Sequence, residues 1–261
     1  MKNNLMARRE AVLGPNVPIF FENPVHLVKG EGVWVWDADG RKYLDCYNNV
    51  PHVGHCHPNV VAAIAAQAAI LNTHTRYLHD GIIDYAERLT AKFQPQLNQV
   101  IMVCSGSEAN DIALRMAQAM TGKTGIISTD NTYHGNTMAV SQLSSRKPPI
   151  GGYAANIRHV TAPDTLRPVG GNTAGQAEAF AREIQIAIDD LEASGHGFSG
   201  FLFCPTFANE GLPNLPQDFM QPAAKVIHAA GGILIADEVQ PGFGRSGDTW
   251  WGHDWLGLSP D

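Results

Sequence analysis

From residue 99 onward, short uninterrupted apolar runs alternate with segments of helical periodicity, and this alternation constrains the fold more than any other feature. Strands that are apolar on both sides must be covered on both faces, as they are in a mostly parallel sheet flanked by helices. We therefore predict an α/β fold. The expected strands are 99–104, 125–129, 158–162, 200–204 and 231–237, and the expected helices are 107–120, 177–194 and 222–230.

The N-terminal part of the chain has a different pattern. Residues 32–45 alternate around the dipeptide Asp39-Gly40, which is typical of a β-hairpin turn. Residues 58–71 begin with a proline and continue with an alanine-rich run, which predicts a helix, and residues 81–93 predict a second one. The expected domains are a small N-terminal β-containing lobe over 1–58 and a large domain over 59–261.

Charge and composition exclude several classes of protein. The formal net charge is −7, and the lysines and arginines are scattered, which argues against binding to nucleic acid or to an anionic membrane. We expect no transmembrane helix, because no run of 18 apolar residues exists, and no signal peptide, because the first ten residues lack an apolar stretch. The four cysteines are widely spread, and we expect reduced thiols in a cytoplasmic protein.

Three local patterns resemble sites that we do not expect. Residues 242–247 match G-x-G-x-x-G, but they do not turn directly from a strand into a helix, as a dinucleotide site requires. Residues 122–124 resemble the end of a P-loop, but Ala117 stands where its first glycine would be. The histidines and the cysteine of 52–57 are zinc ligands by type, but they are too close in sequence to face one ion easily, so we favour a polar turn.

Residues 104–110 (CSGSEAN) join an expected strand to an expected helix. The free N–H groups and the positive dipole at a helix start attract anions. Gly106 would let the backbone approach a phosphate closely, and Ser107 could add a hydroxyl group. The alternative is an ordinary strand–helix loop with a serine N-cap, and this segment by itself favours that alternative, because such loops are common.

Two further elements follow expected strands. Tyr133 and His134 precede Gly135 in a loop after 125–129, where an aromatic ring could stack on a planar ligand, or where the segment is only a surface turn. Asp237 follows an apolar run and needs a cation or hydrogen-bond donors, which a turn or an arginine such as Arg245 could also supply. Together with the helix start, these residues provide a phosphate cradle, an aromatic ring for stacking and an acid beside a ring nitrogen. These are the contributions that a protein makes to pyridoxal-phosphate chemistry.

The motifs SGSEAN, YHG and ADEVQPGFGRSG occur in an order and at a spacing that resemble class III aminotransferases, a branch of the fold-type I pyridoxal-phosphate enzymes. The resemblance runs from about Pro18 to Asp261. Residues 43–58 and 71–89 look especially like the phospho-lyase branch, which acts on ethanolamine phosphate or phosphohydroxylysine. The resemblance implies the large domain of the fold-type I transferases, with a mostly parallel sheet flanked by helices.

The resemblance also implies roles for residues near the cofactor. Gly106 and Ser107 would hold the phosphate of pyridoxal 5'-phosphate. Tyr133 would stack on one face of the pyridine ring, with His134 beside it.

Other roles carried over from the family concern the rest of the ring and the substrate. Asp237 would pair with the ring nitrogen, Val239 would pack on the other face, and Gln240 would reach the phenolic oxygen. Asn49 and Val50 occupy the segment that lines the substrate pocket in relatives.

The sequence departs from the family pattern in two places. The Schiff-base lysine of the family is expected beyond Asp261, none of the seven lysines matches its position, and the C-terminal lobe of the family is absent. We therefore expect the 261-residue chain to be inactive alone. Residues 204–216 also differ from the Glu-Pro or Glu-Ser stretch of many relatives, so a gating role does not carry over simply to Glu210.

Three functions follow from these observations. The first is an aminotransferase that moves an amino group between an amine or amino acid and a keto acid. The second is a pyridoxal-phosphate-dependent phospho-lyase that eliminates phosphate from an O-phosphorylated amine. The third is a truncated, non-catalytic relative that only binds the cofactor. Because the family is usually homodimeric, we expect self-association, and we expect neither nucleic acid nor membrane as a partner.

Overall fold

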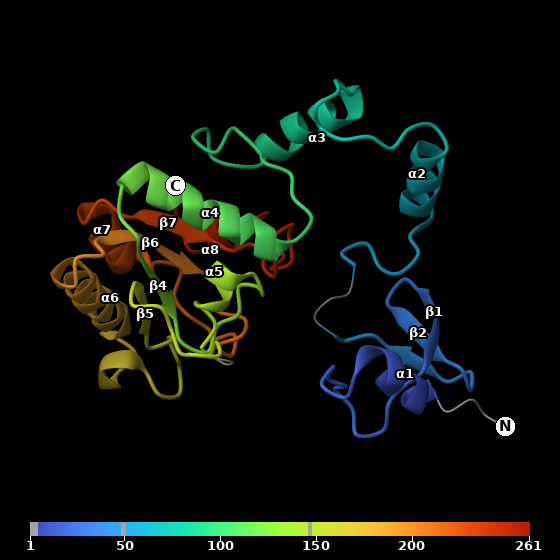
Figure 1. Cartoon of the computed structure of the whole chain (residues 1–261), viewed down its shortest axis with the longest axis horizontal. Coiled ribbons are helices and arrows are strands. Elements are labelled where there is room, and N and C mark those ends of the chain that lie inside the picture. Colours follow the sequence, from blue (N-terminus) through green and yellow to red (C-terminus); the bar gives the residue numbers. More distant parts are fainter. Residues whose placement is uncertain (1–4, 48–50, 146–147) are drawn as a thin grey trace. The chain divides into compact units, whose positions relative to one another are not determined.

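The computed structural model describes residues 5–47, 51–145 and 148–261, so the substrate-pocket candidates Asn49 and Val50 lie outside the described residues. The chain divides into two compact units, Met1–His74 and Thr75–Asp261 (Figure 1). Among the described residues, the search for a membrane-crossing helix found no segment of sufficient length and apolarity.

The first unit contains a three-stranded antiparallel sheet in the order β1-β2-β3. The expected hairpin is confirmed, with its turn between β2 and β3. Asp37 at the end of β2 holds this turn, because its carboxylate accepts hydrogen bonds from the N–H groups of Asp39 and Arg41 and from the hydroxyl group of Tyr43. The elements are α1 (Leu5–Leu13), β1 (Leu27–Glu31), β2 (Trp34–Asp37), β3 (Lys42–Leu44) and α2 (Pro58–Ala68).

The second unit is built on a parallel four-stranded sheet in the order β5-β4-β6-β7, which confirms the predicted α/β fold. Its strands are β4 (Gly125–Thr129), β5 (Ile157–Val160), β6 (Phe198–Phe203) and β7 (Ile233–Ala236). Its helices are α3 (Asp80–Thr90), α4 (Gly106–Thr121), α5 (Met138–Ser141), the short 3-10 helix η1 (Val169–Gly171), α6 (Gln176–Ala193), α7 (Gln221–Ala229) and α8 (Gly252–Trp255).

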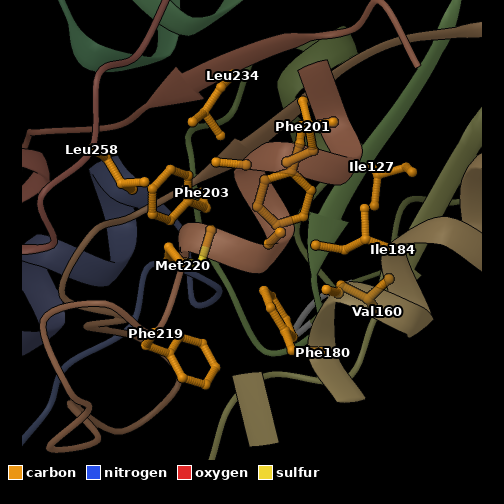
Figure 2. Close-up of a cluster of buried hydrophobic side chains, with 14 of the residues drawn as sticks. Ile127, Val160, Phe180, Ile184, Phe201, Phe203, Phe219, Met220, Leu234 and Leu258 are labelled. Carbon is orange, nitrogen blue, oxygen red and sulfur yellow. The ribbon is translucent and has the colours of Figure 1, made fainter. Parts of the chain in front are cut away.

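Helices cover both faces of this sheet. Successive side chains of a strand point to opposite faces, so each strand contributes to two cores. Ile127 of β4 and Phe201 of β6 belong to the larger core, which includes residues of α6 and α7 (Figure 2). Ile126 and Leu202, their neighbours in sequence, face the smaller core with Leu114 of α4. β4 and β6 therefore have the two-sided burial that the sequence predicted, whereas β5 and β7 are buried only in part.

The strand predicted over 99–104 is wrong, because this run forms no strand and Ile101 and Met102 are exposed. A strand needs a neighbour to complete its hydrogen-bond ladder, and the described residues place none beside this run.

Within the described part of the chain, β7 is an edge strand, with β6 on one side only. On its other side, the N–H group of Asp261 donates to the carbonyl oxygen of Leu234 at 3.1 Å.

Candidate functional site

Polar residues from three segments of the second unit come together at the carboxyl edge of the parallel sheet. One segment is the start of α4, the second is the loop 132–136 after β4, and the third begins at Asp237, directly after β7. Parallel strands bring their carboxyl ends to one edge, where open α/β sheets bind ligands.

The start of α4 has a nearly reciprocal capping arrangement. The hydroxyl group of Ser105 accepts a hydrogen bond from the N–H group of Glu108 at 3.2 Å, and the carboxylate of Glu108 accepts one from the N–H group of Cys104 at 2.9 Å. The N–H groups of Gly106 and Ser107 lie in the first turn and have no acceptor within the helix. A serine N-cap and an anion cradle therefore coexist here, since different residues supply them.

Two glycines allow the three segments to approach closely. A Cβ atom on Gly106 would lie 2.7 Å from Cγ2 of Val239, which is nearer than carbon atoms can pack. A Cβ atom on Gly135 would lie 2.4 Å from Oγ of Ser107, and Gly135 also has a φ of +136°. The candidate site is therefore shaped by contacts that only glycine permits at these two positions.

The loop 132–136 contacts the cradle directly. The hydroxyl oxygen of Ser107 accepts a hydrogen bond from the N–H group of Asn136 at 3.1 Å, so the Ser107 O–H group can still donate to a ligand. The side-chain amide of Asn136 donates to the hydroxyl oxygen of Tyr133 at 2.8 Å. The Tyr133 side chain remains 46% exposed, which leaves surface of its ring open to a planar group.

A buried hydrogen-bond network surrounds Asp237. Its Oδ2 atom accepts from Nδ1 of His134 at 2.7 Å and from the amide of Asn110 at 2.9 Å. The other ring nitrogen of His134 lies 3.0 Å from the hydroxyl group of Thr132. The Oδ1 atom of Asp237 accepts only the N–H group of Val239, at 3.1 Å, and so has capacity for a further donor.

These contacts keep Asp237 ionised although it is buried. Burial raises the pKa of its carboxyl group, but the hydrogen bond and charge of His134 and the donors on Val239 and Asn110 outweigh burial. The pKa of Asp237 therefore lies below its ordinary value of 3.8. Asp237 takes its hydrogen bonds from these groups rather than from an arginine.

The network includes residues that the sequence reasoning did not single out. Asn110 lies four residues along α4 from Gly106, which is one turn or about 6 Å along the helix axis. Its amide also donates to the carbonyl oxygen of His134 at 2.9 Å, so it joins α4, the loop and Asp237. Its position one turn after a glycine-containing helix start was the available signal. The site thus offers an anion cradle at the start of α4 and a buried carboxylate that is bonded to Asn110, one turn further along the same helix.

The remaining predicted residues lie at the margins of this site. Val239 is 72% exposed beside Gly106, and Gln240 follows it half-buried. Glu210 accepts a hydrogen bond at Oε1 from the hydroxyl group of Thr129 at 2.7 Å, while its Oε2 atom is buried without a partner. Its gating role stays open.

The glycine motif at 242–247 and the histidine and cysteine cluster at 52–57 are the next two segments to locate in the structure. Residues 242–247 form turns, and the next helix, α8, begins only at Gly252. In the first unit, His55 pairs with Asp45, with Nε2 and Oδ2 2.7 Å apart. No group of three or more histidine, cysteine, aspartate or glutamate side chains comes together as a metal site among the described residues.

A family model and several known proteins match this chain over most of its length. Residues 21–261 match the family model described as aminotransferase class-III. The chain is 35% identical to a Drosophila melanogaster protein named alanine–glyoxylate aminotransferase 2-like, over all of this chain and 54% of the relative. It therefore spans about half the length of that curated relative.

Solved structures agree with this assignment. A phospholyase from Arthrobacter, in complex with phosphoethanolamine, is 43% identical with a TM-score of 0.93, and the match covers 98% of this chain and 61% of that one. An (S)-enantioselective omega-transaminase from Thermomicrobium roseum is 27% identical with a TM-score of 0.84, over 98% of this chain and 61% of that one.

Proposed function

Because the chain belongs to the class III aminotransferase family, we propose that it forms the part of a pyridoxal 5'-phosphate enzyme that holds the cofactor. The observation that carries this proposal is the buried Asp237 network beside the start of α4. An anion cradle at the start of α4 and an ionised carboxylate bonded to Asn110, one turn further along that helix, suit a ligand with a phosphate at one end and a basic ring nitrogen at the other.

The residues present fit this cofactor. The N–H groups of Gly106 and Ser107 and the Ser107 hydroxyl group would hold its phosphate, and Val239 and Tyr133 would contact the ring faces. Asp237 would accept a hydrogen bond from the ring nitrogen. When bound, the cofactor supplies an electron sink for bonds broken at the amine-bearing carbon of a substrate.

The role of the network is to keep a negative charge at Asp237. Oδ2 is already occupied by His134 and Asn110, so Oδ1 is the atom with capacity for the ring nitrogen. A carboxylate that stays ionised in a buried position favours the protonated form of a nitrogen beside it. The His134 side chain is fully buried, which keeps water away from this pairing.

For the whole protein, we propose phosphate elimination from an O-phosphorylated amine, with transamination between an amine or amino acid and a keto acid as the alternative. Elimination is supported by the 43% identity to the Arthrobacter phospholyase, against 27% to the Thermomicrobium roseum transaminase. Transamination is supported by the Drosophila melanogaster relative, which has an aminotransferase name. Self-association and a cytoplasmic location stay predictions.

Two assays on a polypeptide extended to the full length of the relatives would separate these reactions. Phosphate release from ethanolamine phosphate without a keto acid supports elimination. Loss of the amine only when pyruvate is added supports transamination and contradicts elimination. Neither reaction, with the cofactor bound, would favour the third hypothesis, a non-catalytic relative.

Cofactor binding can be tested with the 261-residue chain itself. Pyridoxamine 5'-phosphate is a suitable probe because it needs no covalent bond to a lysine. We expect saturable binding in a fluorescence titration, at least about 10-fold weaker in Asp237→Ala, since hydrogen bonds to charged groups contribute about 1.5–3 kcal/mol. Asp218→Ala, at an exposed acid outside the site, is the matched control. Equal binding by all three proteins would contradict the proposal.

We further propose that the 261-residue polypeptide does not turn over amines by itself. Among the described lysines, none hydrogen-bonds to Asp237, His134 or Asn110. Borohydride reduction with pyridoxal phosphate, followed by intact-mass measurement and peptide mapping, tests this directly. A stoichiometric adduct on one lysine of this chain would show that the active site is placed wrongly.

A further inference from the structure

Glu238 lies between two residues of the candidate site, Asp237 and Val239, but its own side chain is bound elsewhere. Its Oε2 atom accepts from the N–H group of Gly252 at 2.8 Å, and its Oε1 atom accepts from both the N–H group and Nδ1 of His253, each at 2.8 Å. Glu238 and His253 are 13% and 2% exposed. The carboxylate is thus largely buried with three donors, which offset the cost of its burial.

These bonds close the segment 239–251 into a compact loop. The N–H group of Gly242 donates to the carbonyl oxygen of Glu238 at 2.9 Å, at the start of the loop. A Cβ atom on Gly242 would lie 2.7 Å from that oxygen and 3.1 Å from the Trp251 ring. The loop therefore packs tightly against the residues that bracket it, and it includes the glycine motif that resembled a dinucleotide site.

The far end of the loop is anchored to the segment that follows α3. Phe93 stacks on the Trp251 ring, with 4.1 Å between centroids and 16° between planes, and the indole N–H group of Trp251 donates to the carbonyl oxygen of Lys92 at 2.7 Å. Oε1 of Gln94 lies 3.3 Å from Nε2 of His253. Glu238 is thereby bonded to a packed group of side chains, which we call the frame: Trp251, His253, Phe93 and Gln94.

Because Glu238 lies between Asp237 and Val239 in the chain, its bonds to Gly252 and His253 restrict the positions of both neighbours. The side chains of Asp237, Glu238 and Val239 contact different partners, and these contacts show which way each one points. The Glu238 side chain contacts Gly252 and His253, whereas Asp237 contacts His134, and Val239 lies against Gly106. Fixing Glu238 on one side therefore fixes Asp237 and Val239 on the other.

We propose that Glu238, held by His253, is a positioning residue that sets Asp237 and Val239 for contact with the cofactor ring. This inference rests on the proposed function, since it assigns the ring contacts to those two residues. It predicts that loss of the Glu238 bonds weakens recognition of the ring and leaves the phosphate cradle at Gly106 and Ser107 intact, because the cradle belongs to α4.

The test compares two ligands of the 261-residue chain, pyridoxamine 5'-phosphate and inorganic phosphate. Glu238→Gln places an amide N–H group against donors, and we expect it to weaken pyridoxamine phosphate binding about 10-fold. Inorganic phosphate, measured by competition or directly by calorimetry, should bind within about 2-fold of wild type. The circular dichroism of bound pyridoxamine phosphate at saturation should also change, because it reports ring orientation.

The matched control is Glu192→Gln. The Glu192 carboxylate also accepts a backbone N–H group, that of Phe198 at 3.0 Å, together with Nζ of Lys123 at 2.8 Å, but at the amino end of β6. We expect this variant to lose stability and keep wild-type affinity for both ligands. If Glu238→Gln does not fold, His253→Gln removes the imidazole contacts with Glu238 and Gln94, keeps the backbone N–H bond to Glu238, and should weaken pyridoxamine phosphate binding about 3-fold.

The outcomes are distinct. Wild-type chain that binds no pyridoxamine phosphate overturns the proposed function and this inference with it. Wild-type binding that is unchanged in Glu238→Gln and His253→Gln overturns this inference alone. Equal weakening of pyridoxamine phosphate and inorganic phosphate also overturns it, because the effect would then be a general loss of structure. Selective weakening of pyridoxamine phosphate supports it.

Discussion

Gly106→Ala probes the contact between the start of α4 and Val239. The added Cβ atom would lie 2.7 Å from Cγ2 of Val239, about 1 Å inside the favourable separation of two carbon atoms. Val239 is 72% exposed and can move aside, so the free energy of unfolding should change by less than about 1 kcal/mol. Binding should suffer more, because the displaced Val239 can no longer contact the cofactor ring.

The expected loss of binding can be estimated from the two methyl groups of Val239. A buried methylene-sized group contributes about 0.8 kcal/mol, so loss of the ring contact should cost about 1–2 kcal/mol, or roughly 10-fold in affinity. Val239→Ala should cause a similar loss. In the Val239→Ala background, however, Gly106→Ala should add less than about 2-fold, since Cβ of residue 239 lies 3.9 Å away in ordinary contact.

Fluorescence titration with pyridoxamine 5'-phosphate and urea denaturation, applied to wild type, both single variants and the double variant, complete the cycle. The expected coupling between the two sites is about 1 kcal/mol. If Gly106→Ala reduces affinity by the same factor in both backgrounds, the close approach to Val239 is not the cause, and the placement of the ring between these segments is refuted.

Three further predictions concern stability. Ser105→Ala removes the N-cap of α4 and should lower the free energy of unfolding by about 1 kcal/mol in urea denaturation; an unchanged value would contradict the capping role. Gly135→Ala should destabilise the chain by at least about 2 kcal/mol more than Gly151→Ala, because both glycines have positive φ but only Gly135 faces a neighbour, Ser107; equal losses would mean that backbone strain alone matters. Because the pKa of Asp237 is lowered from 3.8, its ionisation stabilises the folded chain above that pH, and this contribution is lost as the pH falls through the folded-state pKa. The melting-temperature difference between wild type and Asp237→Asn should therefore be constant above about pH 5 and shrink below pH 3.8, and a constant difference at every pH would contradict the assignment.

The sequence predicted the elements whose signals are local. The continuous apolar run before Asp237 is a strand, in which Leu234 is buried and the other residues are partly buried, and the segment from Gly106 is a helix, because apolar patterning and capping chemistry act within a few residues. The run 99–104 failed as a strand because pairing depends on a neighbour that local sequence does not encode. Asn110 was missed for the same reason, since its partner Asp237 lies 127 residues away.

Glu238 shows a second limit of reasoning from sequence. Its place within the motif DEVQ gives no indication that its side chain is bound away from the candidate site, because that depends on where His253 and Gly252 pack. The motif identifies the segment, and only the fold separates the residues that face the ligand from the residue that holds them.

β7 has no strand on its outer side among the described residues, although Asp261 bonds both backbone groups of Leu234 there, and this edge position has a consequence for work with this polypeptide. Its four residues, ILIA, contain no charge or proline, which are the features that natural edge strands use to prevent pairing with other chains. Ile101 and Met102 lie exposed in an apolar segment of the same unit. Purified chain should therefore associate increasingly with concentration and gain intermolecular β-structure on mild heating.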